Sequence, residues 1–185
     1  ATDPVKYLQR LFKFIRERGY PVTGFKLMYD EGDHCEAVVD FLAADKNIPI
    51  IHVKRRNLLR GLLSLQRAQA TGRWYLASSD EAPPEQPTIH LSQSFCYENF
   101  DHLEAQQDKY TERFKGHKVM EIYYEDFAMD PAATAIPCFE FLGLSRPDRI
   151  NVVSKKMGMD SLRDSIENYD ELKAHFLRWA SFFED

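Results

Sequence analysis

Hydrophobic residues recur along the chain with two periods, one typical of helices and one typical of strands. The helical spacing predicts helices over six stretches: 4–18, 35–42, 58–70, 96–115, 131–144 and about 168–179. Short β-branched or aromatic runs predict strands at 24–30, at 48–53 and within 118–127. Because strands alternate with helices, we predict an α/β fold with a parallel sheet flanked by helices.

Two of the predicted helices carry residues that mark a start or a break. Asn57 is a good N-cap for the helix over 58–70, and the leucines of that helix cover most of its circumference. This helix is therefore predicted to be largely buried. Pro137 lies inside the stretch 131–144, where it predicts a kink or two shorter helices.

The length of 185 residues fits one domain with a substantial core, so a single domain over residues 1–185 is predicted. The helical period is lost after Thr71-Gly72, and a long loop is predicted over residues 71–95. This loop contains the polar, proline-rich stretch ASSDEAPPEQPT at 77–88. Long loops on compact domains often carry function, but a simple mobile connection has the same composition.

Composition and charge narrow the class of partner. A net charge of −5 argues against nucleic-acid binding, which normally needs a broad basic surface. The three cysteines are widely spaced and indicate neither disulfides nor a zinc site, so a reducing, cytoplasmic location is predicted. No apolar run reaches transmembrane length, and the first residues, ATDPVKYLQ, lack the pattern of a signal peptide.

Three consecutive cations at residues 54–56 lie where a predicted strand leads into a predicted helix. Ligands of parallel α/β sheets bind at the carboxyl ends of the strands, and a helix start favours phosphate or sulfate. Arg56 lies at this boundary, and Ser64 lies eight residues later, about two turns into the helix. The pattern indicates a small anionic ligand, although a solvated charge run or ion pairs on the helix surface would look the same.

This junction also resembles a known family. The stretch IPIIHVKRRNLLRGLLSLQRAQATGRW is similar to the 3′-phosphate-binding segment of sulfotransferases, where an arginine precedes a serine by eight residues. The stretches GFKLMYDE, IYYEDF, FEFLGL and SLRDSIENYDEL resemble further landmarks of the bacterial carbohydrate and glycolipid sulfotransferases, in the same order. The resemblance covers residues 24–172 and rests on five motifs, each of which is weak alone.

The resemblance implies a fold, a donor and a set of donor ligands. The fold would be the three-layer sulfotransferase fold, similar to that of P-loop NTPases. The donor would be 3′-phosphoadenosine-5′-phosphosulfate (PAPS), with no metal, and its sulfuryl group would pass to a hydroxyl or amine. Arg56 and Ser64 would bind the 3′-phosphate. Lys155, Lys156 and Arg163 would add phosphate contacts, or else form a solvated basic patch.

Candidates for the catalytic base follow the predicted strand at 24–30. Glu31 is the first choice, because carboxylates serve this role in related bacterial enzymes, and His34 is the second. Asp30, Glu31 and Asp33 can instead cap the next helix. Lys26 is predicted to lie mid-strand between apolar neighbours, where it would face the ligand or pair with a core carboxylate.

One part of the family pattern has no counterpart in the sequence. Sulfotransferases begin with a strand and a Gly/Ser-rich loop for the 5′-phosphosulfate, so we expect this segment upstream of Ala1; natural truncation or degeneration are the alternatives. A non-catalytic interaction module and a P-loop kinase therefore compete with an active sulfotransferase, although the kinase motif GxxxxGK[ST] is absent. Small alcohols, saccharides, glycolipids and peptide tyrosines all remain possible acceptors, and the oligomeric state stays open.

Overall fold

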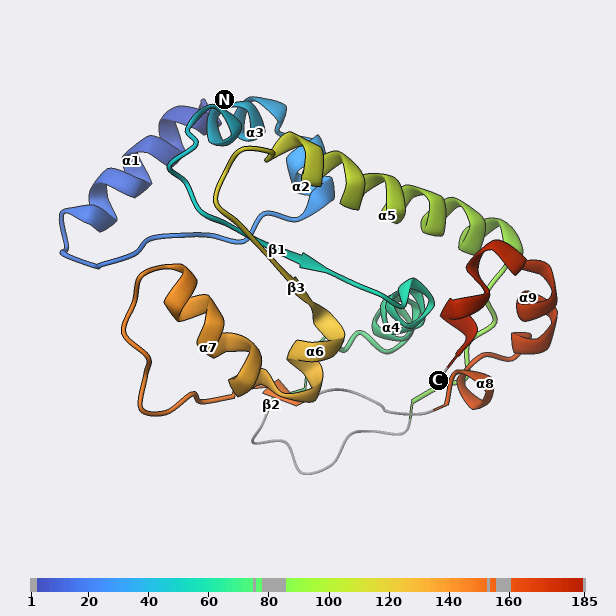
Figure 1. The fold of residues 1–185 in the computed structure, drawn as a ribbon. Helices are drawn as coiled ribbons and strands as arrows, with labels where there is room; N and C mark the ends of the chain where they lie inside the picture. The colour runs from blue at the N-terminus through green and yellow to red at the C-terminus, as the bar shows by residue number, and fades with distance from the viewer. Residues whose placement is uncertain (1–2, 75, 78–85, 153, 156–160, 185) are drawn as a thin grey trace.

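The computed structural model describes residues 3–74, 76–77, 86–152, 154–155 and 161–184 (Figure 1). Its helices are α1 (Pro4–Arg16), α2 (Tyr29–Asp33), α3 (Glu36–Ala44), α4 (Leu58–Thr71), α5 (Gln93–Arg113), α6 (Tyr124–Met129), α7 (Pro131–Phe141), α8 (Leu162–Ser165), α9 (Tyr169–His175) and the 3₁₀ helix η1 (Leu177–Phe183). Its strands are β1 (Ile50–Lys54), β2 (Leu76–Ala77), β3 (Val119–Tyr123) and β4 (Ser154–Lys155). Among these helices, none has both the length and the apolar character needed to cross a membrane.

The strands β1 and β3 pair in parallel, with His52 opposite Glu121. Because both strands run the same way, their carboxyl ends meet at one edge, where α4 and α6 begin (Figure 1). This pairing confirms the predicted α/β class and the strands predicted at 48–53 and within 118–127. In the described part of the chain the remaining pair, β2 with β4, is short and antiparallel.

The predicted strand at 24–30 is wrong. Residues 24–28 lie outside any helix or strand, and Tyr29 already begins α2. The Glu31 side chain accepts the Met28 N–H at 3.0 Å, which favours the start of a helix over continuation of a strand. A strand also needs a ladder partner, and no described strand pairs with this segment.

The long helix α5 connects two hydrophobic clusters. Figure 1 shows it running from near α2 and α3 to the C-terminal elements. The first half of α5 joins α4 and the C-terminal elements in a cluster that contains Leu58, Leu59, Leu62, Leu63, Cys96, Phe100, Leu172, Phe176, Trp179, Phe182 and Phe183. The end of α5 joins α1 and α3 in a second cluster, formed by Leu8, Val38, Val39, Leu42, Tyr110 and Phe114. The candidate junction after β1 therefore leads directly into α4, a helix whose leucines are anchored in the first cluster.

Local signals place α4 as predicted. The Asn57 side chain accepts the Arg60 N–H at 3.0 Å and so caps the helix. The same side chain donates to the Phe182 carbonyl at 3.0 Å, which ties the start of α4 to η1. Pro137, in contrast, lies within α7 and does not divide it in two.

Candidate functional site

The junction after β1 meets the junction after β3 through one arginine. Arg56 donates from Nη1 and Nη2 to the two carboxylate oxygens of Asp126, at 2.6 and 2.8 Å. Its guanidinium also lies over the ring of Tyr123, 3.9 Å from the ring centroid. The pair is exposed, and it raises the pKa of Arg56 and lowers the pKa of Asp126. An internal carboxylate thus shares the corner where the sequence predicts a bound anion.

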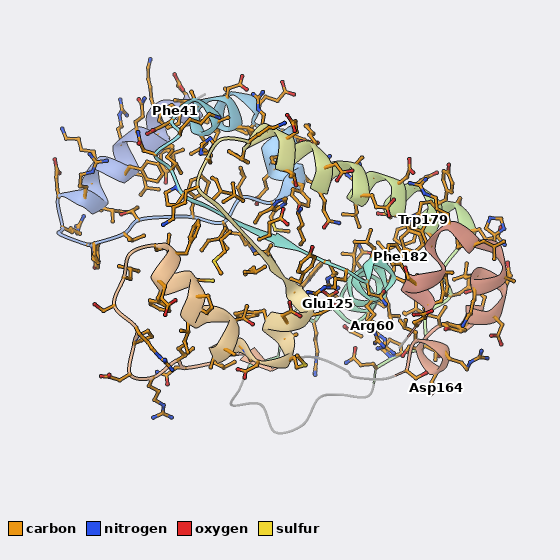
Figure 2. All side chains as sticks on the ribbon, in the orientation of Figure 1. Phe41, Arg60, Glu125, Asp164, Trp179 and Phe182 are labelled. Carbon is orange, nitrogen blue, oxygen red and sulfur yellow. The ribbon has the colours of Figure 1, made fainter. Side chains whose placement is uncertain are left out.

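The neighbouring carboxylate holds the backbone of the same junction. Glu125 accepts the backbone N–H groups of Arg56 and Asn57, each at 3.2 Å. Figure 2 shows Glu125 at the start of α6, close to α4, which carries Arg60. The two acidic residues of the IYYEDF motif therefore have separate roles, one on the backbone and one on the guanidinium.

Arg55 lies at the same junction, and the sequence pattern did not single it out. Its guanidinium lies 4.0 Å from the Tyr124 ring centroid, and burial lowers its pKa. A Cβ at Gly61 would lie 3.0 Å from its Nη1, so Arg55 runs along the first turn of α4. A glycine inside a helix is destabilising unless something needs the space. Gly61 is therefore the feature of the sequence that indicates the close approach of the Arg55 side chain to α4.

Ser64 is exposed on α4, three residues after Gly61 and four after Arg60. Residues three and four apart are neighbours on a helix surface, so Ser64 lies one turn beyond the strip that Arg55 covers. No described contact joins Ser64 to Arg56, so their joint binding of one anion stays a prediction.

A chain of polar contacts, with the buried His52 at its centre, crosses the sheet beside this edge. Burial raises the pKa of Tyr29 to about 12, so its phenol stays protonated, and its hydroxyl lies 2.6 Å from His52 Nε2. The other ring nitrogen of His52 lies 4.0 Å from Glu121, which also pairs with Lys54. Burial, aided by Lys54, lowers the pKa of His52. The Tyr29–His52 contact fixes α2 beside the middle of β1.

This depressed pKa predicts an acid-sensitive fold. Below the ordinary value of 6.5 the unfolded chain binds a proton at residue 52 while the folded protein does not. The free energy of unfolding should therefore fall with decreasing pH, by up to about 1.4 kcal/mol per pH unit, until the lower folded pKa is reached.

The measurement is urea unfolding at pH 7.5 and 5.5, for wild type and for His52→Gln. The variant should lose less stability between the two values, because it has no imidazole to protonate. An equal loss in both proteins would mean that other groups carry the pH dependence.

The two candidate bases lie on or just after α2. Glu31 is exposed and uses one carboxylate oxygen to accept the Met28 N–H, so it caps α2 rather than the helix predicted from residue 35. His34 is also exposed, and its Nδ1 lies 2.6 Å from the Asp30 carbonyl. A carbonyl only accepts, so Nδ1 carries the proton and neutral His34 has a free acceptor at Nε2.

The structure also changes what was expected of Lys26 and Asp33, which lie just before α2 and at its end. Lys26 was expected mid-strand among apolar neighbours, but it is exposed in the irregular segment, since no strand forms there. Asp33 accepts hydrogen bonds from Lys109 at 2.7 Å and Gln106 at 2.6 Å, and lies 3.0 Å from the Tyr110 hydroxyl. These contacts, led by Lys109, lower the pKa of Asp33 to about 2. Asp33 therefore anchors α2 to α5.

Among the three C-terminal cations that the sequence singles out, Arg163 is the one whose side chain is described, and it pairs within the C-terminal elements. Arg163 on α8 donates to Asp170 at 2.7 Å, and its guanidinium lies over the Tyr169 ring. The backbone of Lys155 pairs with Leu76 in the short sheet, and Lys156 lies outside the described residues. Within the described ranges, no group of three or more His, Cys, Asp or Glu side chains is placed to hold a metal ion.

The chain is similar to nodulation protein H from two rhizobia. It is 30% identical to the protein of Rhizobium tropici over 148 residues, which are 78% of this chain and 58% of that protein. It is 28% identical to the protein of Rhizobium meliloti over 148 residues, or 77% and 59% of the two chains. The resemblance to the sulfotransferase family is confirmed. The sulfotransferase-like chain spans just under three fifths of the length of these relatives.

The other comparisons add no relatives. No protein-family model matches the sulfotransferase-like chain. No solved structure matches it either.

Proposed function

We propose that this chain is part of a sulfotransferase that moves the sulfuryl group of PAPS to a hydroxyl or amine of a saccharide. The observation that carries the proposal is the junction of β1 and α4, with Arg56 and Ser64 in the family's spacing at the carboxyl edge of a parallel sheet. The similarity to nodulation protein H supports the same conclusion.

The 3′-phosphate of the donor would bind at Arg56. Asp126 uses one N–H of each terminal nitrogen, and no described residue contacts Nε. An arginine has five N–H donors, so the edge that includes Nε–H stays available to a phosphate. The Arg56–Asp126 pair is exposed and so contributes little to stability. The guanidinium can therefore bind a phosphate as well, against the repulsion between that phosphate and the Asp126 carboxylate.

The acceptor would bind on the α2 side. In the proposed step the acceptor oxygen forms a bond to sulfur while the bond from sulfur to the 5′-phosphate oxygen breaks. The electron pair of that bond leaves with adenosine 3′,5′-bisphosphate, and the acceptor proton passes to Glu31 or His34. Glu31 Oε1 and His34 Nε2 have no described partner, so either atom can receive it.

A saccharide acceptor suits one exposed aromatic side chain after α4, although no described contact joins that side chain to α2. Trp74 follows α4 and is 63% exposed, which is unusual for so large an aromatic side chain. Exposed tryptophan rings have an apolar face and a polar N–H, and so suit a sugar ring with its mixed surface.

The test of this proposal is the affinity of the full-length protein for adenosine 3′,5′-bisphosphate, measured by calorimetry. Arg56→Ala should weaken binding about tenfold or more, the usual cost of losing a hydrogen-bonded charged partner of an anion. Ser64→Ala should weaken it less, because a neutral donor is lost.

The matched control is Arg178→Ala. Arg178 is also exposed, pairs with Asp101 and Glu104, and lies over the Trp179 ring, but it is on η1. The Arg178→Ala protein should bind the bisphosphate with the wild-type affinity. If Arg56→Ala binds the bisphosphate as tightly as wild type, Arg56 does not bind the donor. If the protein transfers no sulfuryl group from PAPS to any saccharide, the non-catalytic module is favoured.

A further inference from the structure

The residues after β3 hold the residues after β1 in a fixed arrangement. Tyr123 covers one face of the Arg56 guanidinium, and Asp126 binds its terminal edge. Glu125 binds the two backbone N–H groups at residues 56 and 57. Three side chains of one short segment thus restrain the backbone, the plane and the rotation of a single arginine.

An unrestrained arginine loses much rotamer freedom when it binds a phosphate, and this loss lowers the affinity. Binding of a phosphate by a planar guanidinium also depends on how the guanidinium is oriented, because the two N–H groups along one of its edges must reach two phosphate oxygens together. At Arg56 both requirements are met in advance by groups that leave the Nε edge without a described partner.

We infer that Asp126 and Tyr123 are positioning residues, which preorganise Arg56 for the 3′-phosphate of the donor. This inference rests on the proposed function. The opposite reading of the same geometry is that Asp126 is a competitor that occupies Arg56 until the donor displaces it. The two readings differ in sign, since loss of the carboxylate weakens binding in the first and strengthens it in the second.

The experiment measures calorimetric affinities for adenosine 3′,5′-bisphosphate and adenosine 5′-monophosphate in the full-length protein. Asp126→Asn should weaken bisphosphate binding about two- to tenfold, the range expected for ordering one long side chain. It should leave monophosphate binding unchanged, because that ligand has no 3′-phosphate. A merely structural defect would weaken both.

Two further variants test the ring and the coupling. Tyr123→Leu should weaken bisphosphate binding, whereas Tyr123→Phe should keep the wild-type affinity because it retains the aromatic face. In an Arg56→Ala background, Asp126→Asn should have no effect, since the residue that it positions is gone.

The matched control is Asp101→Asn. It removes a carboxylate from an exposed arginine that also lies over an aromatic ring, Arg178, and should leave both affinities unchanged. If the wild-type protein binds the bisphosphate and Asp126→Asn binds it equally or more tightly, the inference is wrong but the proposed function stands. A wild-type protein that does not bind the bisphosphate overturns the proposed function, and the inference with it.

Discussion

Replacing Phe100 with alanine is expected to lower the free energy of unfolding by about 3–5 kcal/mol, the usual cost of deleting a buried phenyl ring. Phe100 is fully buried on α5, with ring centroids of Phe176, Trp179 and Phe182 between 5.2 and 5.6 Å away. Figure 2 shows Trp179 and Phe182 on the C-terminal elements beside α5. The lost ring would leave a cavity that three large aromatics cannot easily fill.

Urea unfolding followed by tryptophan fluorescence measures this change, with Phe14→Ala as the matched control. Phe14 is 53% exposed on α1, so its removal should change stability by only about 0.5 kcal/mol. A loss below 1 kcal/mol for Phe100→Ala would mean that this cluster does not hold α4 and α5 together.

Gly32→Ala is expected to lower the free energy of unfolding by about 2–4 kcal/mol, through overpacking and a disturbed hydrogen-bond network. A Cβ at this position would lie 2.0 Å from the Tyr110 hydroxyl oxygen. That hydroxyl lies 3.0 Å from Asp33 and 3.1 Å from the Tyr29 carbonyl, so it cannot move without losing both contacts. Under the proposed function, α2 also carries the candidate base Glu31, so sulfuryl transfer should fall as well.

The control is Gly24→Ala, where a Cβ would meet nothing within 4 Å. Thermal unfolding should show little change for this variant. Combining Gly32→Ala with Tyr110→Phe should cost less than the sum of the single changes, because removing the hydroxyl relieves the clash. Strict additivity would contradict the steric explanation.

Local sequence determined most of the helices and both strands of the parallel pair. Asn57 caps α4 with its own side chain, and apolar residues at helical spacing define the buried face of that helix. These signals act over a few residues, so they can be read without the fold. The same holds for the cationic junction after β1, where position and resemblance single out Arg56 as a candidate that no contact in the structure yet tests.

Tertiary structure decided what the local pattern could not. The stretch at 24–30 has strand-like residues, but a strand exists only where another chain segment supplies the ladder, and none of those described does so. Asp126 is 70 residues from Arg56 and reaches it only because β1 and β3 pair in parallel and end at the same edge. The sequence by itself thus determined which residues lie at the junction, whereas the pairing of the strands decided which carboxylates hold them, because such contacts depend on register between distant segments.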